Sequence, residues 1–209
     1  MSQTSIGVRM AALSMVASAG LGIWLELREP TSEAAIVAGV AALTLLTLVA
    51  PFALIPFVRQ RLAPWAFVGI AVWVIGGAIA IYLGAWVYLL LFEGATWAPG
   101  NHWFIAEIAC LMAGQTLVLI AIAAGLPSQP APRPIKLLVI TLASGVLAFV
   151  VVACQTAFMN ASPGSMELFR WTSEIAHAGT MLLFAWGLVD ADRTLRRTDP
   201  PAARTLSRR

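Results

Sequence analysis

Six apolar runs, each at least 18 residues long, take up most of this chain of 209 residues. A helix rises about 1.5 Å per residue, so each run is long enough to cross a hydrocarbon core of about 30 Å. Backbone groups inside a bilayer must bond within their own segment, which favours helices. The runs are residues 10–27, 34–58, 66–92, 104–126, 136–159 and 168–188. The sequence therefore predicts an all-α fold, a polytopic integral membrane protein built as a six-transmembrane-helix bundle.

The composition excludes an ordinary soluble domain. Hydrophobic residues make up 60% of the chain and charged residues only 11%, whereas soluble domains carry about 25% charged residues. The segments between the apolar runs are too short to fold alone. We therefore expect one six-span transmembrane domain over residues 1–192, followed by a basic cytoplasmic tail over residues 193–209.

The distribution of basic residues predicts the orientation. The chain has 13 Lys and Arg residues, and all except Arg28 and Arg170 fall on one side of the predicted bundle. Such a bias marks the cytoplasmic side, so we expect both termini in the cytoplasm of a bacterial-type inner membrane. The basic residues lie beside apolar runs, which indicates contact with the lipid bilayer and not with nucleic acid.

Acidic motifs lie near the predicted starts of the three inward-running helices. They are Thr31-Ser32-Glu33, Ala106-Glu107 and Thr172-Ser173-Glu174. We expect each motif to open its helix, because a capping side chain satisfies free N–H groups and an acid complements the helix dipole. The similar spacing of the motifs also fits three helical hairpins of similar length. Both interpretations stay open.

Ionisable side chains in the fourth and sixth runs predict a polar site in the outer leaflet. Glu107 lies near the outer end of the fourth run, and Glu174 and His177 share one face near the outer end of the sixth. Gln155 approaches the same level from the fifth run. Ionisable groups inside a membrane are costly and often functional. We predict that these four residues bind a small ligand or a proton; interhelical hydrogen bonding is the alternative.

His177 has a second potential use as a metal or haem ligand. Glu174 and His177 form a Glu-x-x-His pair, but a di-iron bundle needs two such pairs and two further Glu. Cys110 and Cys154 lie inside apolar runs and offer soft sulfur atoms for copper. In this alternative the metal ligands are His177, Cys110 and Cys154. The cofactor stays unknown among haem, copper and quinone.

The sequence contains no HExxH, GxGxxG or P-loop motif and no Ser/His/Asp arrangement. We therefore expect a non-enzymatic protein. It is either a small transporter or an accessory subunit of a larger membrane complex, with other membrane subunits as partners. The alternative is a membrane redox or metal-handling protein that uses His177 as a ligand.

Overall fold

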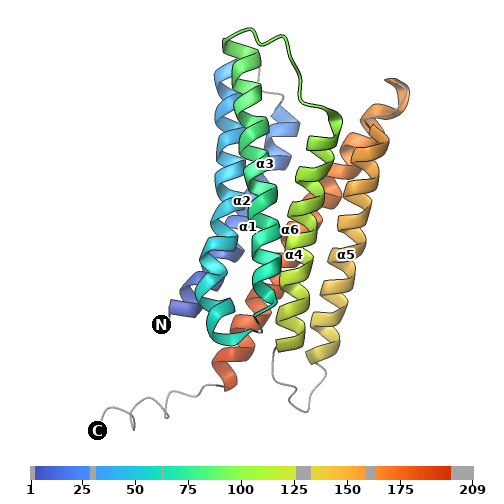
Figure 1. The fold of residues 1–209 in the computed structure, drawn as a ribbon. Coiled ribbons are helices and arrows are strands. Elements are labelled where there is room, and N and C mark those ends of the chain that lie inside the picture. The colour runs from blue at the N-terminus through green and yellow to red at the C-terminus, as the bar shows by residue number, and fades with distance from the viewer. Residues whose placement is uncertain (1–2, 29–31, 63, 126–132, 159–162, 199–209) are drawn as a thin grey trace.

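A computed structural model describes residues 3–28, 32–62, 64–125, 133–158 and 163–198, and these residues form six helices and no strand (Figure 1). The helices run alternately in opposite directions along the bundle. Their bounds are α1 Gln3–Arg28, α2 Glu33–Arg61, α3 Ala66–Phe92, α4 Asn101–Gly125, α5 Arg133–Phe158 and α6 Pro163–Thr198. The prediction of an all-α fold is confirmed for the described residues.

The helices pack as a closed ring. Each helix packs against the next along the chain, and α1 packs against α6 to close the ring. The most extensive packing lies within three hairpins, α1 with α2, α3 with α4, and α5 with α6. The start of α1 and the end of α6 lie at the same end of the bundle (Figure 1).

Charge distinguishes the two ends of this ring. We call one the basic end, because it carries Arg9, Arg59, Lys136 and Arg193. We call the other the acidic end, because it carries Glu26, Glu93 and Glu167.

Five of the described helices, α1 to α5, are long and apolar enough to cross a membrane. The bundle is therefore compatible with a multi-pass membrane protein. α6 is not among the five, because Glu174 and His177 interrupt its apolar stretch and Asp190 and Asp192 follow it. The six-span count stays a prediction.

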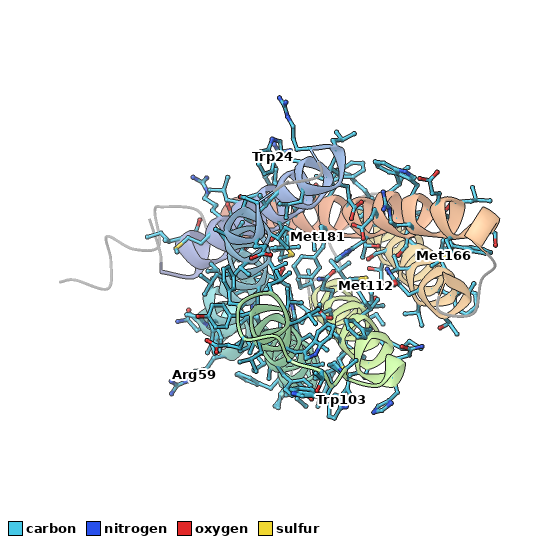
Figure 2. The ribbon with its side chains drawn as sticks, turned by 90° about the horizontal axis from the view of Figure 1, so that it is seen from above. Trp24, Arg59, Trp103, Met112, Met166 and Met181 are labelled. Carbon is cyan, nitrogen blue, oxygen red and sulfur yellow. The ribbon has the colours of Figure 1, made fainter. Side chains whose placement is uncertain are left out.

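Large apolar side chains lie on the outside of all six helices. Examples are Leu13, Leu45, Ile75, Ile120, Phe149 and Ile175. Seen along the bundle, Trp24 and Trp103 lie at its periphery, whereas Met112 and Met181 lie between the helices (Figure 2). An apolar exterior of this kind suits contact with lipid.

The tightly packed core lies in the middle and in the basic half of the bundle. Trp73 of α3 and Phe184 of α6 are fully buried and meet edge to face, with ring centroids 5.1 Å apart. Met15, Leu54 and Phe57 are also fully buried there. These side chains fill the basic half of the ring.

Glycines bring α3 and α4 close together. A Cβ atom on Gly114 would lie 2.6 Å from the backbone nitrogen of Trp73, and one on Gly76 would lie 2.8 Å from the backbone nitrogen of Leu111. Small residues at helix contacts are typical of packing in lipid, where backbones approach closely.

α2 begins at its predicted motif. Ser32 is the N-cap, and its hydroxyl oxygen accepts a hydrogen bond from the backbone N–H of Ala35 at 3.2 Å. Glu33 follows in the first turn.

The other two acidic motifs do not open their helices, so this part of the prediction is wrong. α4 begins at Asn101 and α6 at Pro163, which places Glu107 and Glu174 beyond the first turn. Proline suits a first helical position because its fixed φ matches the helix and it has no N–H to leave unpaired. The helix dipole acts mainly within the first turn, so it does not explain either acid.

The basic tail begins as helix. α6 continues to Thr198, past the domain boundary that we expected after residue 192. Residues 199–209 of the predicted tail lie outside the described residues.

Candidate functional site

A cavity of about 230 Å³ lies in the acidic half of the bundle, between α2, α3, α4 and α6. Its polar lining residues are Glu107 of α4, His177 of α6, and Thr44 and Thr47 of α2. The rest of the lining is Val, Leu, Ala, Gly and Phe. The cavity therefore combines a carboxyl group and an imidazole with apolar walls.

Small residues on α3 leave the space for this cavity. Gly77, Ala80 and Gly84 line it at one-turn spacings along one face of the helix. A Cβ atom on Gly84 would meet only Val40, at 3.5 Å. The wall at Gly84 is therefore not closely packed.

The residues around Glu107 place its side chain on the cavity wall. Phe104 and Leu111 lie about one turn before and after it, and all three line the cavity. The face of α4 that carries the carboxyl therefore points into the ring.

The inner side of α6 carries polar residues as well as apolar core residues, and large apolar residues cover its outer side. Ser173, Ala176 and Thr180 are buried, whereas Ile175, Leu182 and Trp186 are exposed. The hydroxyl of Thr180 donates to the carbonyl oxygen of Ala176, at 2.9 Å, so it needs no partner outside its own helix. His177 belongs to the inward-facing side.

The ring nitrogen Nε2 of His177 is buried, and no described residue forms a hydrogen bond with it. Most buried polar atoms in proteins have such a partner, so each exception calls for an explanation. Among the described residues that line the cavity, only His177 has a buried side-chain nitrogen or oxygen atom without a hydrogen-bond partner.

His177 also lines a second cavity, of about 20 Å³, between α1, α2 and α6. This volume is close to the minimum that holds one water molecule. Ser18 of α1 and Glu174 of α6 line it as well. The Ser18 hydroxyl is buried and has no hydrogen-bond partner among the residues that the structure describes. Three polar side chains thus surround a space of one-water size.

Glu174 lies on the acidic-end side of His177. Arg170, about one turn earlier on α6, pairs with Glu26 of α1, with Nε and Oε2 3.4 Å apart. Both Glu26 and Arg170 lie close enough to Glu174 to act on it electrostatically. This ion pair links α1 to α6 on the acidic-end side of the small cavity.

Three of the four predicted ligand-binding residues line the two cavities, and the fourth lies elsewhere. Glu107 and His177 share the larger cavity, and Glu174 and His177 share the smaller one. Gln155 of α5 lines neither; its Nε2 donates to the Ser173 hydroxyl at 3.0 Å. Gln155 thus contacts the neighbour of Glu174 and links α5 to α6. Ligand binding by the four residues stays a prediction.

The alternative metal ligands do not gather into a site. Within the described ranges, no three His, Cys, Asp or Glu side chains are placed to hold a metal ion together. Cys110 and Cys154 are half-buried free thiols. His177, Cys110 and Cys154 therefore do not form a ligand group in this structure.

Several residues of the two cavities were not predicted. Thr44 and Thr47 are one turn apart on α2, and their hydroxyls donate to the carbonyl oxygens of Val40 and Leu43, both at 2.9 Å. A one-turn spacing of hydroxyls is visible in the sequence. Ser18 has no such signal, because small residues are frequent throughout α1.

No protein-family model, no curated protein and no solved structure matches the chain.

Proposed function

We propose that this chain is a non-enzymatic multi-pass membrane protein that binds a small ligand or a proton in the cavity beside Glu107 and His177. It serves either as a small transporter or as an accessory subunit of a larger membrane complex. The observation that carries this proposal is His177, which lines the same cavity as Glu107 and whose buried Nε2 has no hydrogen-bond partner among the described residues. A bound ligand or water would supply the missing partner.

The two faces of α6 support a sixth span. Mean hydropathy averages over both sides of a helix, whereas only the outer side meets lipid. The outward residues Ile175, Leu182 and Trp186 are apolar and exposed, so α6 can face a membrane although its inner side carries polar residues. With α6 counted, the start of α1 and the end of α6 lie at the basic end. The excess of Lys and Arg at this end favours a cytoplasmic location in a bacterial-type inner membrane.

The chemistry of the cavity favours a small ligand that donates hydrogen bonds. The hydroxyl protons of Thr44 and Thr47 are already given to their own helix, so these oxygens can only accept. An ionised Glu107 also only accepts. At about 230 Å³, the space is smaller than the roughly 300–1,000 Å³ typical of drug-sized ligands. A small ammonium compound, water or a proton fits these limits.

The two cavities together offer a route for a proton. His177 lies on both, with Glu107 on the larger and Glu174 on the smaller. A water in the smaller space would connect His177 to Glu174 and to the acidic end of the bundle. Toward the basic end, the packed side chains around Trp73 and Phe184 block the path from the cavity. Transport across the bundle would therefore require the basic half to open.

Reaction of an engineered cysteine with thiol reagents tests the proposed site. In a Cys110→Ala, Cys154→Ala background, we expect Thr44→Cys to react with methanethiosulfonate ethylammonium in proteoliposomes. Ala50→Cys, on the same helix but fully buried in the packed half, is the matched control and should stay unreactive. Adding Glu107→Gln should slow the charged reagent by about fivefold or more, because the carboxylate no longer attracts the ammonium.

The neutral reagent methyl methanethiosulfonate separates this effect from a change in structure. Its rate at Thr44→Cys should not depend on Glu107. A Thr44→Cys that reacts no faster than Ala50→Cys with either reagent would show that the cavity is closed to small solutes and would overturn the proposal. Equal rates for the charged reagent with and without the Glu107→Gln change would remove Glu107 from the site.

A further inference from the structure

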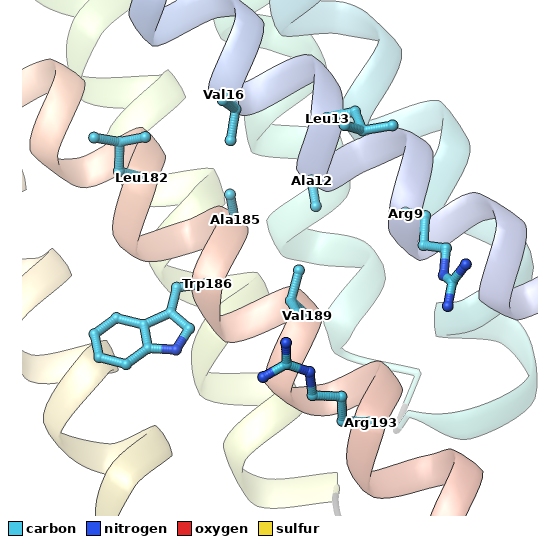
Figure 3. Close-up of a pocket in the computed structure, with 9 residues that line it drawn as sticks. All are labelled: Arg9, Ala12, Leu13, Val16, Leu182, Ala185, Trp186, Val189 and Arg193. Carbon is cyan, nitrogen blue, oxygen red and sulfur yellow. The ribbon is translucent and has the colours of Figure 1, made fainter.

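A third hollow lies on the outer surface, between α1 and α6 at the basic end (Figure 3). Its volume is about 560 Å³, and it is separate from the cavity of Glu107. Apolar residues of both helices form its floor, and two arginines, Arg9 and Arg193, lie at one end. We call this hollow the α1–α6 groove.

The shape of the groove follows from the sequence. Ala12 and Ala185 are small and lie where α1 and α6 approach each other, whereas Val16, Leu182 and Trp186 are larger and exposed at the edges. Figure 3 shows Ala12, Val16 and Ala185 between the two helices, Trp186 on the far side of α6, and both arginines toward the basic end. The groove is therefore apolar along its length and cationic at one end.

The acids near the groove are each paired with a base from a neighbouring helix. Arg9 Nε lies 3.3 Å from Asp192 Oδ2, and Lys136 Nζ lies 3.0 Å from Asp190 Oδ1. These pairs reduce the negative charge that would repel an anion. Arg193 adds a further positive charge, and its side chain is exposed.

Arg9 retains capacity to bind an anion. Its side chain is half exposed although Nε faces Asp192. A guanidinium has five N–H donors, more than one carboxylate uses, and its planar fork suits phosphate oxygens. Arg9 can therefore contact Asp192 and a phosphate at the same time.

Trp186 marks the depth of the headgroup region. It lines the groove, is about half exposed, and has the Lys136 ammonium 5.1 Å from its ring centroid. Tryptophan and basic residues concentrate where hydrocarbon meets headgroups. The arginine end of the groove is therefore suited to the level of the lipid phosphates.

We propose that the α1–α6 groove binds one anionic phospholipid from the leaflet at the basic end. Its phosphate contacts Arg9 and Arg193, and one acyl chain lies along Ala12, Val16 and Leu182. Charge complementarity favours an anionic lipid, because basic residues between transmembrane helices at the cytoplasmic side recognise anionic headgroups. The lipid fills a groove that helix packing alone leaves open, and so contributes to the contact between α1 and α6.

Native mass spectrometry of the full chain tests this proposal. The protein is released from mixed micelles that contain equal amounts of phosphatidylglycerol and phosphatidylcholine. We expect the wild type to retain one phosphatidylglycerol in preference. Each basic residue near an anionic surface contributes about a factor of five, so Arg193→Gln should reduce the preference by about fivefold. Arg59→Gln, an exposed arginine at the same end but outside the groove, is the matched control and should change nothing.

Two further variants keep the test decisive if removal of Arg9 alone impairs folding. Arg9→Gln combined with Asp192→Asn removes both charges of the pair and should also lower the preference. Val16→Trp places an indole over the groove and should displace the lipid while both arginines remain. Equal retention of the two lipids by the wild type, or an unchanged preference in Arg193→Gln and Val16→Trp, would overturn the proposal. A second polypeptide that is retained in place of lipid and lost in Val16→Trp would also overturn it, by showing that a partner helix occupies the groove.

Discussion

Gln115 of α4 has no exposed surface, and neither its amide nitrogen nor its amide oxygen bonds to another residue within the described part of the chain. Burying a polar group without a partner costs about 1–3 kcal/mol. We therefore expect Gln115→Met, which keeps the unbranched shape, to raise the melting temperature of the purified protein in detergent.

Gln155→Met is the matched control for this change. Gln155 donates to Ser173 at 3.0 Å, so its replacement should lower stability, by about 0.6 kcal/mol for an average hydrogen bond in a membrane protein. A loss of stability in Gln115→Met that exceeds the loss in Gln155→Met would mean that Gln115 has a partner, such as an internal water.

The sequence predicted the depth of the candidate site residues better than it predicted their contacts. Because the fourth and sixth helices were predicted to run in the same direction, Glu107 and His177 were expected at a similar depth. Both residues line one cavity. The rotation of each helix about its own axis depends on side-chain packing, which a single sequence does not give. Gln155 therefore lies at the predicted level but faces Ser173 and not the cavity.

At the scale of helices, the contact between α3 and α4 depends on glycine. We expect Gly114→Ala to lower the yield of folded, monodisperse protein in size-exclusion chromatography. The added Cβ would lie 2.6 Å from the backbone nitrogen of Trp73, so one helix must move. Gly84→Ala is the control, because its Cβ would meet only Val40 at 3.5 Å. Equal behaviour of the two variants would show that the helices separate at little cost.

Helix positions were predictable from apolar runs. The starts of α2 and α3 lie within one residue of the predicted ones, whereas α1 and α6 begin several residues earlier than predicted. A run ends where polar residues begin, but α6 continues through polar residues from Pro163 to Thr198. Polar residues on the inner side of α6 are tolerated because they face other helices, whereas those near its ends, such as Glu167 and Arg193, are exposed. Hydropathy cannot show this, since it does not distinguish the two sides of a helix. The same limitation explains why Glu174 was expected at a helix start and lies inside a helix.

At the scale of the whole molecule, the excess of basic residues predicts which end faces the cytoplasm. In a Cys110→Ala, Cys154→Ala background, Thr96→Cys at the acidic end should react with a membrane-impermeant maleimide in intact cells. Gln60→Cys at the basic end should react only after the membrane is permeabilised. Both positions are exposed, so a difference in labelling reflects the side of the membrane. Labelling of Gln60→Cys alone in intact cells would reverse the orientation.

The closed ring has a consequence for the order of the chain. α1 and α6 are neighbours, and the start of one and the end of the other lie at the same end of the bundle (Figure 1). A circularly permuted chain that begins at α5, continues through a new link from α6 to α1, and ends at α4 would keep every helix in its present direction. Both new termini would lie at the basic end, so the charge signal for orientation would be retained. The chain could thus begin at any of the three hairpins as long as their cyclic order is kept, because such a reordering preserves which helices touch.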